Sequence, residues 1–143
     1  MREPKQIAIR QIDNLSGSLS VLQVDDDIPF AVRRVYFLHG IKDQETRGGH
    51  AHKELWQLII AVSGSFRLSL SSAQQKLDFN LNSPRLGVLV PPMWWRTLSD
   101  FSDGSVCLVL ASEVFEESDH IRDYQSFLSR STEFEAIQST KGS

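Results

Sequence analysis

The sequence has a single cysteine, Cys107, among its 143 residues, so the chain can form no internal disulfide. This excludes the class of small secreted domains that disulfides hold together, and it favours a reducing compartment. We expect Cys107 to act as a small buried hydrophobe within the apolar run 106–111. The chain also lacks any run near the ~18 apolar residues of a membrane-spanning helix, and its first residues lack the apolar core of a signal peptide. The sequence therefore predicts a cytoplasmic protein with no membrane segment.

A net basic charge is missing as well. The chain has 15 Lys and Arg residues against 18 Asp and Glu residues, and this net charge of −3 gives no electrostatic basis for binding nucleic acid. A hydrophobic content of 41% and a charged content of 23% are ordinary for a globular protein. A chain of this length suits one domain, which we place at residues 1–130. We expect residues 131–143 to form a partly disordered tail.

Long stretches of helical periodicity are absent from most of the chain. Short runs instead alternate apolar and polar residues, most clearly over 65–70, and turn residues separate them. The runs 7–12 and 18–24 flank a turn and predict a hairpin, and only the segment from 118 to about 127 looks helical. Many short strands joined by turns indicate an all-β fold. We therefore expect a jelly-roll β-barrel or sandwich with a short C-terminal helix.

Two histidines stand at alternate positions after a glycine pair. Gly48 and Gly49 precede His50 and His52, and an apolar run rich in β-formers follows and ends at Gly64. We interpret the glycines as a loop that leads into a strand. Alternate residues of a strand point to the same side, so the two imidazoles are expected to share one face. Such a pair suits either metal binding or proton transfer.

The spacing around these histidines resembles that of the metal-binding cupins. Those proteins place a Glu four or five residues after the second His and a third His at the end of a later Pro-x-Gly-x-x-His segment. In this chain the Glu position falls on Trp56 or Gln57, and the third His position is Arg96. An amide is a weak ligand and a guanidinium disfavours a cation, so we expect no metal ion. We assign the histidines to proton transfer and Arg96 to a phosphate or an enolate oxygen.

Several other side chains are weaker candidates. Tyr36 precedes the histidine segment and is either a proton donor to a developing oxyanion or a packed hairpin tyrosine. Only one of the neighbouring Trp94 and Trp95 can face the site, and core or interface packing is the competing interpretation. We interpret three arginines as solvated strand faces: Arg33, Arg34 and Arg67.

Six segments, in this order and spacing, resemble one family over about residues 7 to 128. They are Arg33–Phe37, Arg47–Lys53, Val62–Ser65, Pro91–Arg96, Asp100–Ser102 and the closing stretch Leu110–Tyr124. Together they resemble the dTDP-sugar 3,4-ketoisomerases, the WxcM-like cupins. The resemblance implies a cupin-type jelly roll, no cofactor, and a homodimer with exchanged N-terminal strands.

The resemblance also implies an isomerase. It would convert dTDP-4-keto-6-deoxyglucose through an enediolate into a dTDP-3-keto-6-deoxyhexose, for the 3-amino-3,6-dideoxy sugars of surface polysaccharides such as O-antigen, lipopolysaccharide or S-layer glycans. On this hypothesis His50 moves the carbon-bound proton, while His52 and Tyr36 relay protons at the sugar oxygens. Arg96 orients the diphosphate or stabilises the enediolate, and Arg47 and Trp95 are further candidates for binding the substrate.

Some positions depart from the family pattern. Many relatives have an Asp-x-Arg-Gly turn where this chain has Asn14–Gly17, and many have a second tyrosine where Phe37 stands. His120 replaces a common tyrosine, which we interpret as a packing difference. Two other functions remain open: a dTDP-4-keto-sugar 3,5-epimerase, and a non-catalytic module that binds a sugar nucleotide. The sequence also leaves open the configuration at C4 of the product and a fusion with a transferase domain.

Overall fold

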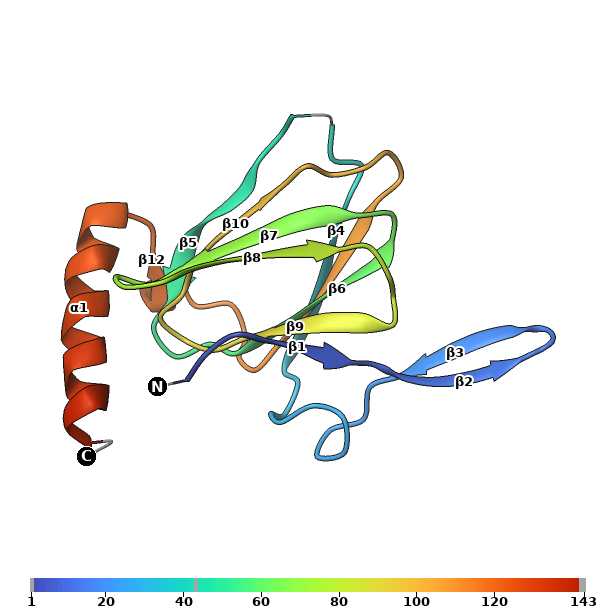
Figure 1. Cartoon of the computed structure of the whole chain (residues 1–143), viewed down its shortest axis with the longest axis horizontal. Coiled ribbons are helices and arrows are strands. Elements are labelled where there is room, and N and C mark those ends of the chain that lie inside the picture. The colour runs from blue at the N-terminus through green and yellow to red at the C-terminus, as the bar shows by residue number, and fades with distance from the viewer. Residues whose placement is uncertain (1, 43, 142–143) are drawn as a thin grey trace.

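A computed structural model describes residues 2–42 and 44–141. It contains two five-stranded antiparallel sheets, a separate two-stranded hairpin and a C-terminal helix (Figure 1). The elements in chain order are β1 (Lys5–Ala8), β2 (Arg10–Asn14), β3 (Gly17–Val21), β4 (Arg34–His39), β5 (Arg47–His52), β6 (Gln57–Ser63), β7 (Phe66–Ser71), β8 (Lys76–Leu81), β9 (Leu86–Val90), β10 (Trp95–Ser99), β11 (Val106–Ala111), the 3₁₀ turn η1 (Glu117–Asp119), β12 (His120–Ile121) and α1 (Tyr124–Lys141).

The two sheets form a sandwich. The first has the strand order β1-β9-β6-β11-β4, and the second has the order β12-β5-β10-β7-β8. Alternate residues of β7 point inward, so Phe66, Leu68 and Leu70 are buried while Arg67 is exposed and pairs with Asp78. These inward side chains meet those of the facing sheet in the main core. The predicted all-β sandwich and the solvated position of Arg67 are therefore confirmed.

Cys107 lies in this core on β11 and has no exposed surface, as predicted. Burial raises the pKa of its thiol to about 12, because a thiolate would be poorly solvated there. The side chain is therefore a structural hydrophobe rather than a nucleophile.

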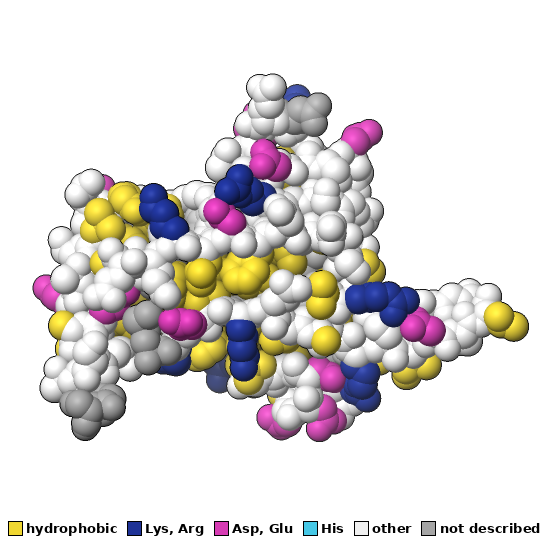
Figure 2. Space-filling view, in the orientation of Figure 1, with side chains coloured by type: hydrophobic (Ala, Val, Ile, Leu, Met, Phe, Trp, Pro, Cys, Tyr) yellow, Lys and Arg dark blue, Asp and Glu magenta, His cyan; other side chains and the backbone are white. Residues whose placement is uncertain are grey.

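The predicted hairpin exists, but its first half is divided between two elements. Residues 5–8 form β1, which pairs with β9 in the first sheet, and only Arg10–Asn14 forms β2 and pairs with β3. Ile9 separates them, because it is buried under the first sheet while its amide donates to the carbonyl of Arg85. From Arg10 onward the β2–β3 hairpin projects from the body as an arm, with hydrophobic side chains at its far end (Figures 1 and 2).

The C-terminal helix differs from the predicted one at both ends. The predicted helix at 118–127 was wrong at its start, because the chain first forms η1 and then β12, which pairs with β5. Asp123 then caps α1 by accepting a hydrogen bond from the amide of Ser126 at 2.9 Å. The helix continues to Lys141, through most of the segment expected to be a tail.

A stripe of buried residues explains this length. Phe127, Ser131 and Glu135 recur every four residues and are at most 4% exposed. Phe127 joins a small cluster on the outer face of the second sheet with Ala51, Met93 and Ile121. Two of the three stripe residues are polar, and the partly buried Leu128 and Phe134 pack against the same cluster. Within residues 2–42 and 44–141, no helix is both long and apolar enough to cross a bilayer.

Candidate active site

The glycine pair is part of strand β5 rather than a preceding loop. Arg96 of β10 pairs with His50, whereas its neighbour Thr97 pairs with Gly48, so Gly49 is an extra residue in a β-bulge. Gly48 and Gly49 have φ angles of 90° and 74°, which favour glycine. A Cβ on Gly48 would also lie 3.0 Å from the carbonyl oxygen of Arg96. The bulge sets the direction of the histidines that follow it.

Beyond the bulge, His50 and His52 point into the sandwich while Ala51 between them faces α1. The predicted common face is therefore confirmed. His52 is 2% exposed and His50 is partly buried, with their ring centroids 4.8 Å apart. Arg96, opposite His50 on β10, is 3% exposed, and none of its three side-chain nitrogens has a hydrogen-bond partner within the described residues. A buried guanidinium without a partner is able to bind an anion.

The facing sheet adds three polar side chains. Gln57, at the start of β6, is 1% exposed, and its amide donates a hydrogen bond to the hydroxyl of Tyr36 on β4 at 2.9 Å. Arg34 lies two residues before Tyr36 on the same face of β4, and its guanidinium carbon is 5.2 Å from the Tyr36 ring centroid. The prediction that Arg34 is a solvated strand residue was therefore wrong, because the register of β4 on β11 turns it inward. Arg33 points outward beside Glu113.

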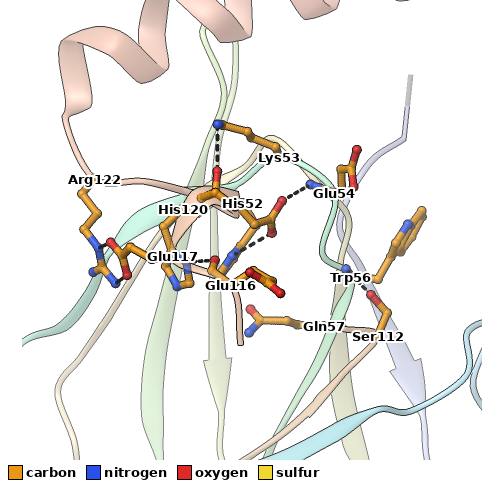
Figure 3. A network of polar contacts seen from close by, with 12 residues as sticks. His52, Lys53, Glu54, Trp56, Gln57, Ser112, Glu116, Glu117, His120 and Arg122 are labelled. Carbon is orange, nitrogen blue, oxygen red and sulfur yellow. Dashed lines mark hydrogen bonds and ion pairs between the residues drawn. The ribbon is translucent and has the colours of Figure 1, made fainter. Parts of the chain in front are cut away.

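His120 is a second member of the cluster, besides Arg34, whose position the sequence did not reveal. It lies on β12 directly opposite His52, with ring centroids 4.4 Å from His52 and 5.1 Å from His50. Its Nδ1 is 2.9 Å from the carbonyl oxygen of Glu116, which fixes the ring (Figure 3). His120 is thus more than the packing difference we predicted, since it brings a third imidazole to the site.

Burial and positive charge keep the two imidazoles of β5, those of His50 and His52, neutral at neutral pH. Desolvation, followed by the charges of Arg96 and His120, lowers the pKa of His50 to about 4. Desolvation and Arg96 lower the pKa of His52 further. Burial also lowers the pKa of Arg96 to about 10, which still leaves it charged at neutral pH. The site therefore combines neutral bases with the fixed positive charges of Arg96 and Arg34.

Tyr36 is a protonated acid in this setting. Burial raises the pKa of its phenol, although the charge of Arg96 and the hydrogen bond from Gln57 oppose the shift. Its hydroxyl accepts from Gln57, so its own proton remains free to point into the site.

Two predicted substrate-binding residues lie away from this cluster. Trp95 points to the opposite side of β10 from Arg96, where its ring contacts Tyr124 and Phe127 at centroid distances of 5.1 and 5.6 Å. There it lines a separate outer hollow of about 340 Å³. Arg47 is exposed at the first position of β5, on the far side of the bulge. The structure therefore brings together four of the six predicted residues, namely His50, His52, Tyr36 and Arg96, together with Arg34, Gln57 and His120.

An acidic hollow of about 460 Å³ adjoins the cluster. It is lined by Lys53, Glu54, Glu113, Val114, Glu116, Ser118 and Asp119. Asp119 belongs to both regions: its Oδ1 accepts from the amide of Glu54, and its Oδ2 lies 3.4 Å from Nδ1 of His52 (Figure 3). The histidines therefore lie between a positive charge, Arg96 on β10, and the carboxylates that line the acidic hollow.

This arrangement suits acid–base chemistry on an anionic species that is partly shielded from water. A neutral imidazole can accept a proton, the phenol can donate one, and Arg96 can stabilise the negative charge that develops between these steps.

Known proteins are similar to this chain in sequence and in fold. The family model described as FdtA: WxcM-like, C-terminal matches residues 2–132. The chain is 38% identical over 125 residues to the TDP-4-oxo-6-deoxy-alpha-D-glucose-3,4-oxoisomerase of Aneurinibacillus thermoaerophilus, a match that covers 87% of this chain and 90% of that protein.

Solved structures agree. A variant of the 3,4-ketoisomerase QdtA from Thermoanaerobacterium thermosaccharolyticum, in complex with TDP-4-keto-6-deoxyglucose, has a TM-score of 0.90 at 33% identity, over 93% of this chain and 96% of that one. A dTDP-4-dehydrorhamnose 3,5-epimerase from Bacillus anthracis has a TM-score of 0.72 at 12% identity, over 82% of this chain and 77% of that one, a likeness that shows the fold alone. From the extent of the family match and of the sequence identity, the chain belongs to the FdtA family of WxcM-like C-terminal domains.

Proposed function

We propose that the chain is a sugar-nucleotide 3,4-ketoisomerase that acts on dTDP-4-keto-6-deoxyglucose. The observation that carries this proposal is the burial of two neutral imidazoles, His50 and His52, beside the unpartnered guanidinium of Arg96. Isomerisation of a ketone needs a base for the carbon-bound proton and a stabiliser for the enediolate. Relatives with more than 30% identity over most of their length are isomerases of this type.

The first step removes a proton from carbon. The 4-ketone acidifies the hydrogen at C3, and His50 takes it as a proton. The electrons of the C3–H bond form a C3–C4 double bond, and the ketone oxygen at C4 becomes negatively charged. Arg96 pairs with His50 across β5 and β10, so its charge lies next to the base and is well placed to stabilise this enediolate.

The second step returns a proton to the neighbouring carbon. The imidazolium of His50 returns a proton to C4, while the hydroxyl at C3 loses its proton and becomes the ketone and the oxygen at C4 takes up a proton, so that no atom is gained or lost. Tyr36 and His52 relay protons between the two oxygens, since one is a protonated phenol and the other a neutral imidazole. The reaction requires no metal ion and no cofactor in this proposal.

The configuration at C4 depends on the face of the enediolate that receives the proton. The product is a dTDP-3-keto-6-deoxyhexose of galacto or gluco configuration. Amination of the 3-ketone would then lead to the 3-amino-3,6-dideoxy sugars of surface polysaccharides.

The protein is further proposed to act in the cytoplasm as a homodimer with exchanged N-terminal strands. Three apolar residues of the projecting arm, Ile12, Leu15 and Leu19, are at least half exposed. Val35 and Phe37 are also exposed on β4, which is an edge strand of the first sheet. An arm from a second copy lying against such an edge would cover both apolar surfaces and supply backbone partners.

Proton exchange tests the proposed reaction directly. Incubation with dTDP-4-keto-6-deoxyglucose in D₂O, followed by NMR, should give a 3-keto product with deuterium at C4. Deuterium at C5 would identify a 3,5-epimerase instead, and an absence of exchange would identify a non-catalytic binding module. The NMR spectrum also assigns the configuration at C4.

A further inference from the structure

The three imidazoles of His50, His52 and His120 converge on one point from two strands. One ring nitrogen from each lies within 4.8 Å of the others. A transition metal ion binds imidazole nitrogen at about 2.0–2.1 Å, which in tetrahedral geometry separates the nitrogens by about 3.3 Å. The rings therefore need to close by up to about 1.5 Å to share one ion.

Each ring has a nitrogen to offer. Nε2 of His52 and Nδ1 of His50 are buried without a hydrogen-bond partner within the described residues. His120 uses Nδ1 toward the Glu116 carbonyl, which leaves Nε2 with a free lone pair. Buried polar atoms without partners need a reason, and ligation of an ion supplies one.

The neighbours of the rings resemble the outer shell of a metal site. Ligating histidines typically direct their second nitrogen to a carboxylate or a backbone carbonyl. Nδ1 of His52 approaches Oδ2 of Asp119 at 3.4 Å, and Nδ1 of His120 lies 2.9 Å from the carbonyl oxygen of Glu116 (Figure 3). These two contacts would hold Nε2 of both rings toward the shared point.

We propose that His50, His52 and His120 bind one divalent first-row transition metal ion of the Zn²⁺ class. Three imidazoles form a ligand set that such ions accept, whereas Mg²⁺ and Ca²⁺ prefer oxygen. The third ligand in this proposal comes from β12 and not from the Arg96 position of β10, whereas the expectation of no metal counted only the two imidazoles of β5.

Arg96, together with Arg34, carries the charge that opposes a cation here. The carboxylates on the other side offset it, since Asp119 contacts His52 and lines the acidic hollow with Glu54, Glu113 and Glu116. One lysine lines the same hollow, and its Nζ donates to the carbonyl of Ser118. The hollow therefore favours the approach of a cation to the histidines from this side.

Ion binding would also regulate the enzyme. A metal ion on His50 occupies the lone pair that would accept the substrate proton, so the bound form cannot isomerise. This consequence rests on the proposed ketoisomerase function, whereas the binding of the ion does not. The three histidines would then form an inhibitory metal site, and a chelator that removes the ion would restore activity.

Calorimetric titration of chelator-treated protein with Zn²⁺, without sugar nucleotide, tests the site. We expect saturable binding of one ion per chain, and visible d–d absorption when Co²⁺ replaces Zn²⁺. His120→Tyr and His120→Gln should each weaken Zn²⁺ binding by at least about 10–100-fold, the usual cost of losing even an outer-shell partner. His39→Tyr is the matched control, because His39 is an exposed histidine at the end of β4 and should leave binding unchanged.

Each outcome decides the matter. Binding that is absent, or that survives in both His120 variants when circular dichroism shows them folded, overturns the site. Loss of binding in His39→Tyr also overturns it, because the ion then lies at the surface. A second titration follows isomerase activity. Inhibition by Zn²⁺ that EDTA reverses supports the proposed inhibition by the metal ion, and full activity at saturating Zn²⁺ overturns that proposed inhibition. A protein that binds Zn²⁺ through His120 but does not isomerise refutes the proposed function and leaves the metal site standing.

Discussion

The side-chain amide of Gln57 donates a hydrogen bond to the hydroxyl of Tyr36 at 2.9 Å, across the first sheet from β6 to β4. Gln57 occupies the position at which the metal-binding cupins carry a Glu ligand. Because an amide can donate where a carboxylate cannot, Gln57 fills an acceptor position of the phenol and leaves its proton for another partner. The same substitution that removes a metal ligand thus orients a proton donor.

Tyr36→Phe should therefore lower kcat by about 10²–10⁴-fold, the usual contribution of a positioned acid, with little change in KM. The hydroxyl relays a proton to an oxygen that is charged only during the reaction, so its loss acts on the transition state. Steady-state kinetics with dTDP-4-keto-6-deoxyglucose measure the effect. Tyr124→Phe removes the only other tyrosine hydroxyl of the chain, on α1, and should be neutral. Equal kinetics for both variants would remove Tyr36 from the mechanism.

His50→Asn should cost at least about 10²-fold in turnover while substrate binding changes modestly, because the base for the carbon-bound proton is lost. Deuterium exchange at the sugar ring should stop in the same variant. His52→Asn should slow turnover but retain exchange, since this ring is assigned to the oxygens. His39→Asn is the control outside the cluster. The assignment of the carbon base is reversed if exchange stops in His52→Asn and persists in His50→Asn.

The acid limb of kcat/KM should lie near pH 4, because His50 has to be neutral and burial lowers its pKa to about 4. Arg96 is the second cause of this shift. Arg96→Met removes a positive charge that opposes protonation, so the pKa of His50 rises and the acid limb moves to higher pH, besides the loss in rate. Arg67→Met, at an exposed arginine paired with Asp78, should leave the limb unchanged. An unshifted limb in Arg96→Met would show that another group titrates.

The projecting arm provides a test of the proposed dimer. Leu19→Asp and Ile12→Asp place a charge on side chains that are 57% and 52% exposed in the single chain, so an isolated chain tolerates them. In a dimer that buries these residues, each charge is desolvated and should shift the equilibrium to monomers. Light scattering after size exclusion gives the mass. Val114→Asp changes a similarly exposed residue outside the arm and should leave the mass unchanged.

Local sequence patterns were sufficient to predict the β-sandwich and about half of the residues in the site. Period-2 alternation located β7, and the His-x-His spacing placed His50 and His52 on one face. Arg34 lies two residues before Tyr36, so the two side chains were expected to share one face of the strand. To predict that Arg34 points inward, however, requires knowing which face of β4 meets the core.

His120 was beyond the reach of such patterns. Strand β12 has two residues and exists because it pairs with β5, far away in the sequence. No local periodicity marks so short a strand. The length of α1 was missed for a related reason, because Ser131 and Glu135 are buried by the tertiary packing of a polar stripe that reads as solvent-exposed.

The buried histidines should also make the fold sensitive to mild acid. In the unfolded chain a histidine has a pKa near ~6.5, whereas in the folded protein burial lowers the pKa of His50 to about 4 and that of His52 further. Between these values the unfolded state binds protons that the folded state excludes, so stability is complete above about pH 6.5 and falls as the pH decreases. Each such histidine contributes a slope of at most about 1.4 kcal/mol per pH unit.

Urea unfolding at several pH values between about 7.5 and 5.5 measures this slope, in a range where ordinary carboxylates stay largely ionised. His50→Gln should reduce the slope by the share of one histidine, because glutamine binds no proton in either state. His39→Gln, which alters a histidine outside the cluster, should keep the slope of the original protein. If the stability of the original protein is flat over this range, the histidines bind protons equally in the folded and unfolded states, and the lowered pKa values of His50 and His52 are contradicted.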